Sequence, residues 1–240
     1  MSRKTPVLLP VAATEQHGEH LPLNTDCLIL EAIVRELDRV VDDRLLILPT
    51  QQVGCSEHHM AFPGSLTLSH ETFRRAVTEV ADSVVRHGFK RVMILNGHGG
   101  NHAIDAVLGE QLGQRYPQVQ TLVADWWTVA AKRTKPMQEG SLGSVGHACE
   151  FETSLMLAIA PQLVDLDAAE DGGIQHHVES MWFDAFQGPV AACYRPFHVL
   201  SHNGVYGRPS LASEEKGRRL LEATVESLKE LIVEFWPDWE

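Results

Sequence analysis

The feature that most constrains this fold is the alternation of short apolar runs with amphipathic stretches. Strand-like apolar runs cover residues 6–13, 45–48, 91–96 and 121–125, and helical spacing of apolar residues covers 26–40, 71–87 and 102–112. An apolar helix over 147–160 and an amphipathic helix over 213–235 follow. Strands that alternate with helices pack as a parallel sheet whose two faces are covered. The sequence therefore predicts an α/β fold, a single-domain sandwich with a mainly parallel sheet flanked by helices on both faces.

Length, charge and cysteine content narrow the class of protein. A chain of 240 residues suits one domain, expected here over 1–240, and the net charge of −12 disfavours nucleic acid and anionic membranes as partners. No segment approaches a transmembrane span. The four cysteines are scattered, as in a cytoplasmic protein with reduced thiols. A small-molecule substrate is the expected partner.

The first polar cluster covers residues 14–26, directly after the first apolar run. Glu15 and His17 are two residues apart, so in an extended chain both side chains point to one face. Gly18 and Pro22 then bend the chain, and Asp26 opens the next helix. Two carboxylates and an imidazole suit Zn²⁺, Mn²⁺ or Fe²⁺. The alternative for Asp26 is a helix N-cap.

The second cluster is NGHGGNH, residues 96–102, after the clearest strand of the chain. A glycine-rich turn before a helix can cradle phosphate, but the G-x-G-x-x-G and Walker patterns are absent. The central His98 instead indicates a ligand held on a tight turn, with the glycines leaving room for metal and substrate.

The third cluster is GHACEFETS, residues 146–154, at the start of the apolar helix. At helical spacing His147 and Glu150 share a face, whereas Glu152 is turned by about a further 200°. Two acids in an apolar helix need partners if they are buried. For Glu152 the alternative is an acid that the helix dipole favours at the N-terminus.

Two other regions leave alternatives open. Residues 54–66 hold Ser56, His58 and His59 in a loop closed by a Pro-Gly pair, which suits either a substrate loop or a simple turn. Residues 165–210 are irregular and rich in glycine, proline, histidine and aromatic residues. A segment of this kind is either functional or a surface excursion that contacts another subunit.

Taken in order, these clusters resemble the creatininase (creatinine amidohydrolase) family. The family pattern E-x-H-G-x-H-L-P followed by an Asp matches 15–26, and NGHGGN matches 96–101. The pattern H-A-G-E-x-E-T-S matches 147–154 with Cys149 in place of Gly, and S-x-H-H…F-P-G-[ST] matches 56–65. The tail NGVYGRPSLASEEKG, 203–217, also fits, so the resemblance spans nearly the whole chain.

The resemblance implies a site with two divalent ions, Zn, Mn or Fe. It implies that Glu15 and His98 hold one ion, that His17 holds the other and that Asp26 bridges them. Creatininase itself has a Glu at the position of Gly100, and family members that also carry NGHGGN imply Glu150 as the fifth ligand, with Glu152 as the alternative. His147 and Glu152 match the family's proton-handling pair. The expected substrate contacts are Ser56, His58, Gly99 and Trp127.

The function implied is that of a metal-dependent amidohydrolase, in which metal-activated water attacks a carbonyl. The bond expected is a small cyclic amide, a formamide or a peptide-like C–N bond. Two alternatives are a hydrolase of an oxidised polyol, of the dehydro-inosose type, and a non-catalytic metal-binding homologue. The complete set of ligand residues argues against the latter. The family also implies a homo-oligomer, a hexamer, for which the stretch MWFDAF, 181–186, offers apolar surface.

Overall fold

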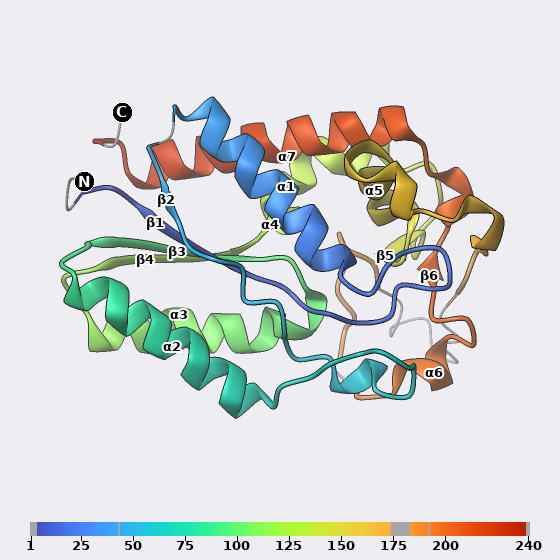
Figure 1. Cartoon of the computed structure of the whole chain (residues 1–240), viewed down its shortest axis with the longest axis horizontal. Helices are drawn as coiled ribbons and strands as arrows, with labels where there is room; N and C mark the ends of the chain where they lie inside the picture. Colours follow the sequence, from blue (N-terminus) through green and yellow to red (C-terminus); the bar gives the residue numbers. More distant parts are fainter. Residues whose placement is uncertain (1–3, 43, 174–182, 192, 239–240) are drawn as a thin grey trace.

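The centre of the structure is a parallel sheet, as the alternation predicts. The computed structural model describes residues 4–42, 44–173, 183–191 and 193–238. The strands are β1 (Val7–Val11), β2 (Leu46–Ile47), β3 (Arg91–Asn96) and β4 (Gln120–Asp125), in the order β2-β1-β3-β4, all parallel. Their carboxyl ends point toward the end of the molecule that carries the short antiparallel pair β5 (Val145–His147) and β6 (Tyr206–Gly207) and the helix α6 (Phe197–Leu200) (Figure 1).

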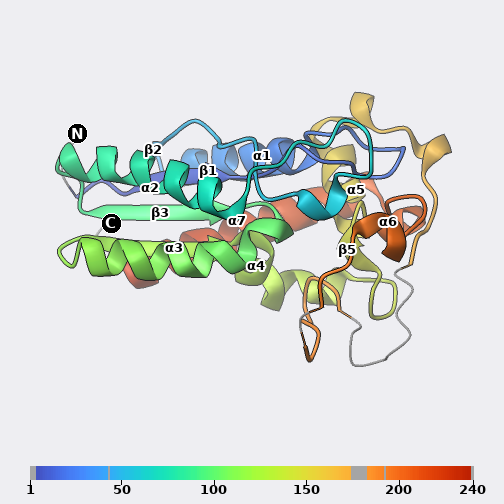
Figure 2. The same cartoon turned by 90° about the horizontal axis from the view of Figure 1, so that it is seen from below.

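Helices cover both faces of this sheet. On one face lie α2 (His70–Arg86) and α3 (His102–Arg115), and on the other lie α1 (Thr25–Val40) and α7 (Glu214–Phe235) (Figures 1 and 2). Both α4 (Trp126–Thr134) and α5 (Glu150–Ile159) pack against α7. The 3₁₀ turns are Glu57–His59, Gly99–Asn101, Lys135–Met137, Pro161–Leu163, Leu166–Ala168 and Pro209–Leu211. In the described part of the chain no helix has the length and apolar character needed to cross a membrane.

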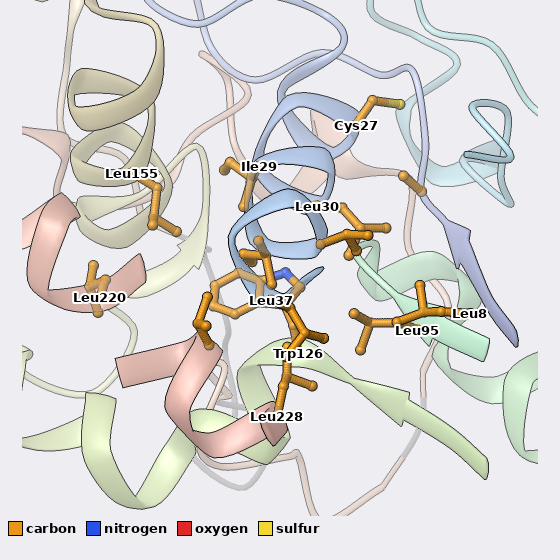
Figure 3. Close-up of a cluster of buried hydrophobic side chains, with 14 of the residues drawn as sticks. Leu8, Cys27, Ile29, Leu30, Leu37, Leu95, Trp126, Leu155, Leu220 and Leu228 are labelled. Carbon is orange, nitrogen blue, oxygen red and sulfur yellow. The ribbon is translucent and has the colours of Figure 1, made fainter. Parts of the chain in front are cut away.

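Alternation along β1 explains why the sheet has two buried faces. Leu9 and Val11 point to α2 and α3 and pack with residues such as Phe73. Leu8 points the other way, into the larger cluster beneath α1, where Leu30 is also fully buried (Figure 3). Each such leucine stabilises the fold by about 1.5–3 kcal/mol through burial. Because helices pack on both faces of the sheet, the strands are held in place, and so are the loops at their carboxyl ends.

Two helices differ from what the sequence predicts. The helix expected over 147–160 begins only at Glu150, because residues 145–147 pair with β6 and the chain turns at Ala148, whose φ is +49°. The helix α4 was not predicted, since β4 runs into it at Trp126 with no glycine or proline to mark a boundary.

The aromatic stretch 181–186 also differs from expectation. Residues 181 and 182 lie outside the described residues. Phe183 packs edge-on against Tyr206 with ring centroids 5.0 Å apart, and Phe186 packs against Phe151 at 5.8 Å. The described part of the stretch therefore turns inward rather than offering an apolar surface.

Candidate active site

Polar side chains from four segments meet at the carboxyl end of the sheet and line one cavity of about 740 Å³. The segments are the loop after β1, the 3₁₀ turn at 57–59, the turn after β3, and the junction of β5 and α5. Parallel α/β sheets place ligands at this end because all the loops after the strands converge there. The titratable residues that line the cavity include Glu15, Asp26, His58, His59, His98, His147 and Glu152.

Asp26 lies between two buried histidines. His17 Nε2 is 3.1 Å from Asp26 Oδ1, and His98 Nδ1 is 3.1 Å from Asp26 Oδ2. His98 Nδ1 also lies 3.3 Å from Glu15 Oε1, and His17 Nε2 lies 3.7 Å from Glu152 Oε1. Glu15 Oε2 and Asp26 Oδ2 are buried, and no group in the described part of the chain donates a well-aligned hydrogen bond to either oxygen. Buried carboxylate oxygens without a donor are costly, so this arrangement suits a cation.

In both His98 and His17, the ring nitrogen that points away from the carboxylates, called here the outer nitrogen, is held by a backbone carbonyl. His98 Nε2 donates to the carbonyl of Cys55 at 3.2 Å, and His17 Nδ1 donates to the carbonyl of Glu15 at 3.1 Å. The outer nitrogen therefore carries a proton, and the inner nitrogen faces the carboxylates. Histidines that bind metals in proteins are oriented by this kind of hydrogen bond.

The charges in the cavity perturb each other strongly. Burial lowers the pKa of His98, but the Glu15 and Asp26 carboxylates outweigh it and raise the pKa to about 10. Burial likewise opposes protonation of His17, yet Asp26 and Glu152 raise its pKa well above the usual value. Burial raises the pKa of Glu15, and the surrounding imidazoles lower it well below its usual range. Protonated histidines thus supply the positive charge that these carboxylates require when no metal is bound.

The donor atoms fall into groups that fit divalent ions. Ligand atoms of Glu15, His58 and His98 lie within 4.8 Å of one another, and so do those of His17, Asp26 and Glu152 and those of Glu15, His17 and His147. Carboxylate oxygens and imidazole nitrogens are the donors that Zn²⁺, Mn²⁺ and Fe²⁺ accept. The residues present therefore fit the two metal positions that the family resemblance implies.

Glu150 and Glu152 have the opposite arrangement to the one expected. Glu150 is fully buried away from the cluster, where its Oε1 accepts from Lys216 Nζ at 2.7 Å and from the backbone N–H of Glu139 at 2.9 Å. Glu152 lines the cavity, close to His17, and its Oε2 accepts from the backbone N–H of Cys149 at 3.2 Å. Glu150 was expected as the ligand from the family resemblance, whereas in the structure both acids lie in the first turn of α5 and it is Glu152 that lines the cavity.

His147 lies where the proton-handling role was expected. Its Nε2 donates to the carbonyl of Gln16 at 2.7 Å, and its Nδ1 lies 3.6 Å from Glu15 Oε1. Gln16 Nε2 donates to the carbonyl of Gly204 at 3.0 Å and to His59 Nδ1 at 2.8 Å. The proton of His59 is then on Nε2, which faces Glu15 Oε1 at 3.5 Å.

The sequence pattern assigns no role to His59 beyond its place in the loop 54–66, and it does not indicate Gln16. The His-His pair in a loop signalled His59 weakly. Gln16 gave no signal, because its partners come from a loop near residue 204 that is remote in sequence.

The expected substrate residues divide into two sets. His58, Gly99 and Trp127 line the cavity, and a side chain at position 99 would meet nothing within 4 Å. Ser56 is fully buried behind the cavity, with its hydroxyl 3.3 Å from His98 Nε2. The irregular segment also lines the cavity, and composition was its only signal in the sequence. Its lining residues include Phe183, Tyr194, Arg195 and Phe197.

Comparison with known proteins gives one consistent result. A family model described as creatinine amidohydrolase matches residues 1–232. Creatinine amidohydrolase of Pseudomonas putida is 30% identical over 96% of this chain and 90% of its own. Mycofactocin precursor peptide peptidase of Mycobacterium ulcerans is 30% identical over 96% of this chain and 86% of its own. Structures described as a mutant creatininase of Zn–Zn type and as a manganese creatininase, each 30% identical, superpose with TM-scores of 0.76 and 0.79, covering 98% of this chain and 92% of theirs.

Proposed function

The chain belongs to the creatininase family, and we propose that it hydrolyses an amide-type C–N bond with two divalent ions held by its own side chains. It is a metal-dependent hydrolase of that family. The observation that carries the two-metal proposal is Asp26, whose two oxygens each face a different buried histidine at 3.1 Å. A carboxylate that offers one oxygen to each of two neighbouring positions could hold a pair of ions together.

Five side chains would hold the ions. Glu15 and His98 would hold one position, His17 and Glu152 the other, and Asp26 both. Zinc and manganese occur in the related structures, and iron remains a further prediction for this donor set. When bound, such ions polarise a carbonyl and lower the pKa of a coordinated water toward neutrality.

His147 is the proposed proton carrier. Burial lowers its pKa below the ordinary value, so the ring is neutral near pH 7. The carbonyl of Gln16 fixes the proton on Nε2 and leaves Nδ1 free beside the carboxylate of Glu15. Nδ1 is therefore placed to accept a proton during attack and to return it to the leaving nitrogen. Proton transfer of this type contributes about a hundred- to ten-thousand-fold in rate.

The cavity favours a peptide-like substrate over a single small ring. Its volume of about 740 Å³ lies in the range of sites that enclose drug-sized ligands. Trp126, Trp127, Phe183 and Phe197 supply apolar and aromatic lining. The half-buried Arg195 also lines it and forms no ion pair with any residue that the structure describes. We expect an amide in a molecule that also carries an apolar group and an anionic group.

A substrate screen with metal-loaded protein tests this proposal. Small cyclic amides, formamides and short peptides with aromatic residues and a free carboxylate would be compared, with amine release as the readout. We expect hydrolysis of at least one amide class, strongest for the peptides. Protein that holds two ions per chain and cleaves none of them would contradict the assignment. Cleavage of an oxidised polyol instead would favour the alternative function.

A further inference from the structure

We propose that His58 is a direct ligand of the metal position formed by Glu15 and His98. This inference rests on the two-metal function proposed above and adds a residue to it. Sequence reasoning placed His58 among the substrate contacts. Three observations support a ligand role instead: its distance from the other donors, the space that it fills, and the absence of any other polar partner among the described residues.

The donor atoms of Glu15, His58 and His98 are close enough to share one ion. All three lie within 4.8 Å of one another, and the His58 and His98 rings are stacked at 18° with centroids 5.9 Å apart. Ligands about 2.1 Å from a tetrahedral ion are about 3.4 Å apart. The separation of the three donors exceeds this value by no more than about 1.4 Å, the difference between 4.8 Å and 3.4 Å.

A side chain at position 100 would collide with the backbone of Cys55 and with the rings of His98 and His58. A Cβ at Gly100 would be 2.9 Å from His58 Cε1, 2.4 Å from His98 Nε2 and 2.1 Å from the carbonyl oxygen of Cys55. The glycine turn therefore packs its bare backbone against both imidazoles. Position 100 therefore supplies no side-chain ligand, and the ring of His58 lies in the adjacent space.

His58 has no other polar role among the residues that the structure describes. His17, His59, His98 and His147 each hydrogen-bond to a backbone or side-chain group. His58 is half-buried, contacts the rings of His59 at 4.2 Å and Phe197 at 6.4 Å, and forms no hydrogen bond within the described part of the chain. A purely packing role would explain the ring contacts but not the placement of a nitrogen beside Glu15 and His98.

Metal affinity separates the ligand role from packing. We would measure metal per chain by elemental analysis, dissociation constants by titration, and the visible spectrum of the Co²⁺-substituted protein. His58→Ala and His58→Gln would be compared with His198→Ala, an exposed histidine on α6. We expect both His58 variants to lose affinity for one ion by at least the roughly 10- to 100-fold typical of a lost supporting group. Their cobalt spectra should change, while His198→Ala should behave as wild type.

The outcomes distinguish this inference from the function on which it rests. Two ions bound to both His58 variants with wild-type affinity and an unchanged cobalt spectrum would overturn the ligand role. Wild-type protein that binds fewer than two ions would instead refute the two-metal function itself. Thermal unfolding of the metal-free proteins controls for folding, because loss of a ligand leaves the metal-free unfolding temperature nearly unchanged.

Discussion

Asp26 has a position in the site that no other described residue shares. Each of its two oxygens faces a separate histidine, whereas His17 contacts only Asp26 Oδ1 and Glu152 Oε1 among the carboxylates. We predict that Asp26→Asn lowers metal content more than His17→Ala, because the amide removes the negative charge between both ions. Elemental analysis of the two variants after identical reconstitution measures this. Equal loss of one ion in both would mean that Asp26 does not bridge.

Glu150 and Glu152 differ in what surrounds them, and this gives a paired prediction. Glu150→Gln leaves the buried Lys216 with only an exposed acid, Glu139, at 2.7 Å. Loss of one partner from a buried pair costs about 3–5 kcal/mol. We predict that Glu150→Gln destabilises the protein and keeps both ions, whereas Glu152→Gln loses one ion and keeps its stability. Denaturant unfolding together with metal analysis tests both, and the reverse result would restore Glu150 as the ligand.

The metal-free site predicts an unusual dependence of stability on pH. Burial lowers the pKa of His98, but Glu15 and Asp26 raise it to about 10, from about 6.5 in an unfolded chain. A histidine whose pKa is raised by folding stabilises the fold fully when the pH is below its pKa in the unfolded chain. That stabilisation is lost as the pH rises through its pKa in the folded protein. We predict that the unfolding temperature of metal-free protein falls between about pH 7 and 10. The metal-loaded protein should change much less, because ions replace the protons. Parallel curves for both forms would contradict this.

At the scale of elements, the sequence predicts those features of the site that depend only on the order of strands and helices along the chain. Glu15, His17, Asp26 and His98 come together as expected, because each follows or closes a parallel strand and those loops share one end of the sheet. The third cluster did not follow its helical spacing. Its geometry depends on β5 pairing with β6, a partner about 60 residues later, and on the positive φ at Ala148. Such long-range pairing leaves no periodic signal in the segment itself.

The packing of α5 against α7 fixes the position of Glu152, and this packing depends on a glycine. A Cβ at Gly217 on α7 would lie 1.8 Å from the backbone oxygen of Ser154 on α5. We predict that Gly217→Ala destabilises the protein by about 1–3 kcal/mol and weakens metal binding by shifting α5. Gly113→Ala is the matched control, since Gly113 lies exposed within α3 with nothing near its Cβ position. That change should stabilise by about 0.5–1 kcal/mol. Equal effects in thermal unfolding would show that the helix contact tolerates a methyl group.

At the scale of the whole molecule, the charge and the site act in opposite directions. The net charge of −12 repels anions at long range, yet the site combines two proposed divalent ions with three carboxylates, and Arg195 lines the same cavity. Local cations act within the cavity, where screening by salt is weaker than at the surface. The negative surface therefore slows capture of an anionic substrate without preventing its binding.

Assembly into an oligomer remains a prediction. The structure indicates a different contact surface from the one that the sequence predicts. Phe183 and Phe186 pack inward, so they do not provide the contact expected from the aromatic stretch. The same irregular segment instead exposes Val190 at 85%, Tyr194 at 69% and Val199 at 59%. Exposed apolar side chains gathered in one segment favour a subunit contact. Tyr194 also lines the cavity, so this contact would close beside the site.

We predict a homo-oligomer, a hexamer, whose interface includes these side chains. Combined Val190→Glu and Val199→Glu changes place two charges in that interface, where desolvation without a partner is costly, so the mass should fall toward that of the monomer. Val107→Glu, at a residue 41% exposed on α3, adds a charge outside the segment and should leave the mass unchanged. Light scattering at micromolar concentration measures all three proteins. A monomeric wild type would refute the assembly, and an oligomer that survives both charges would move its interface to another face of the molecule.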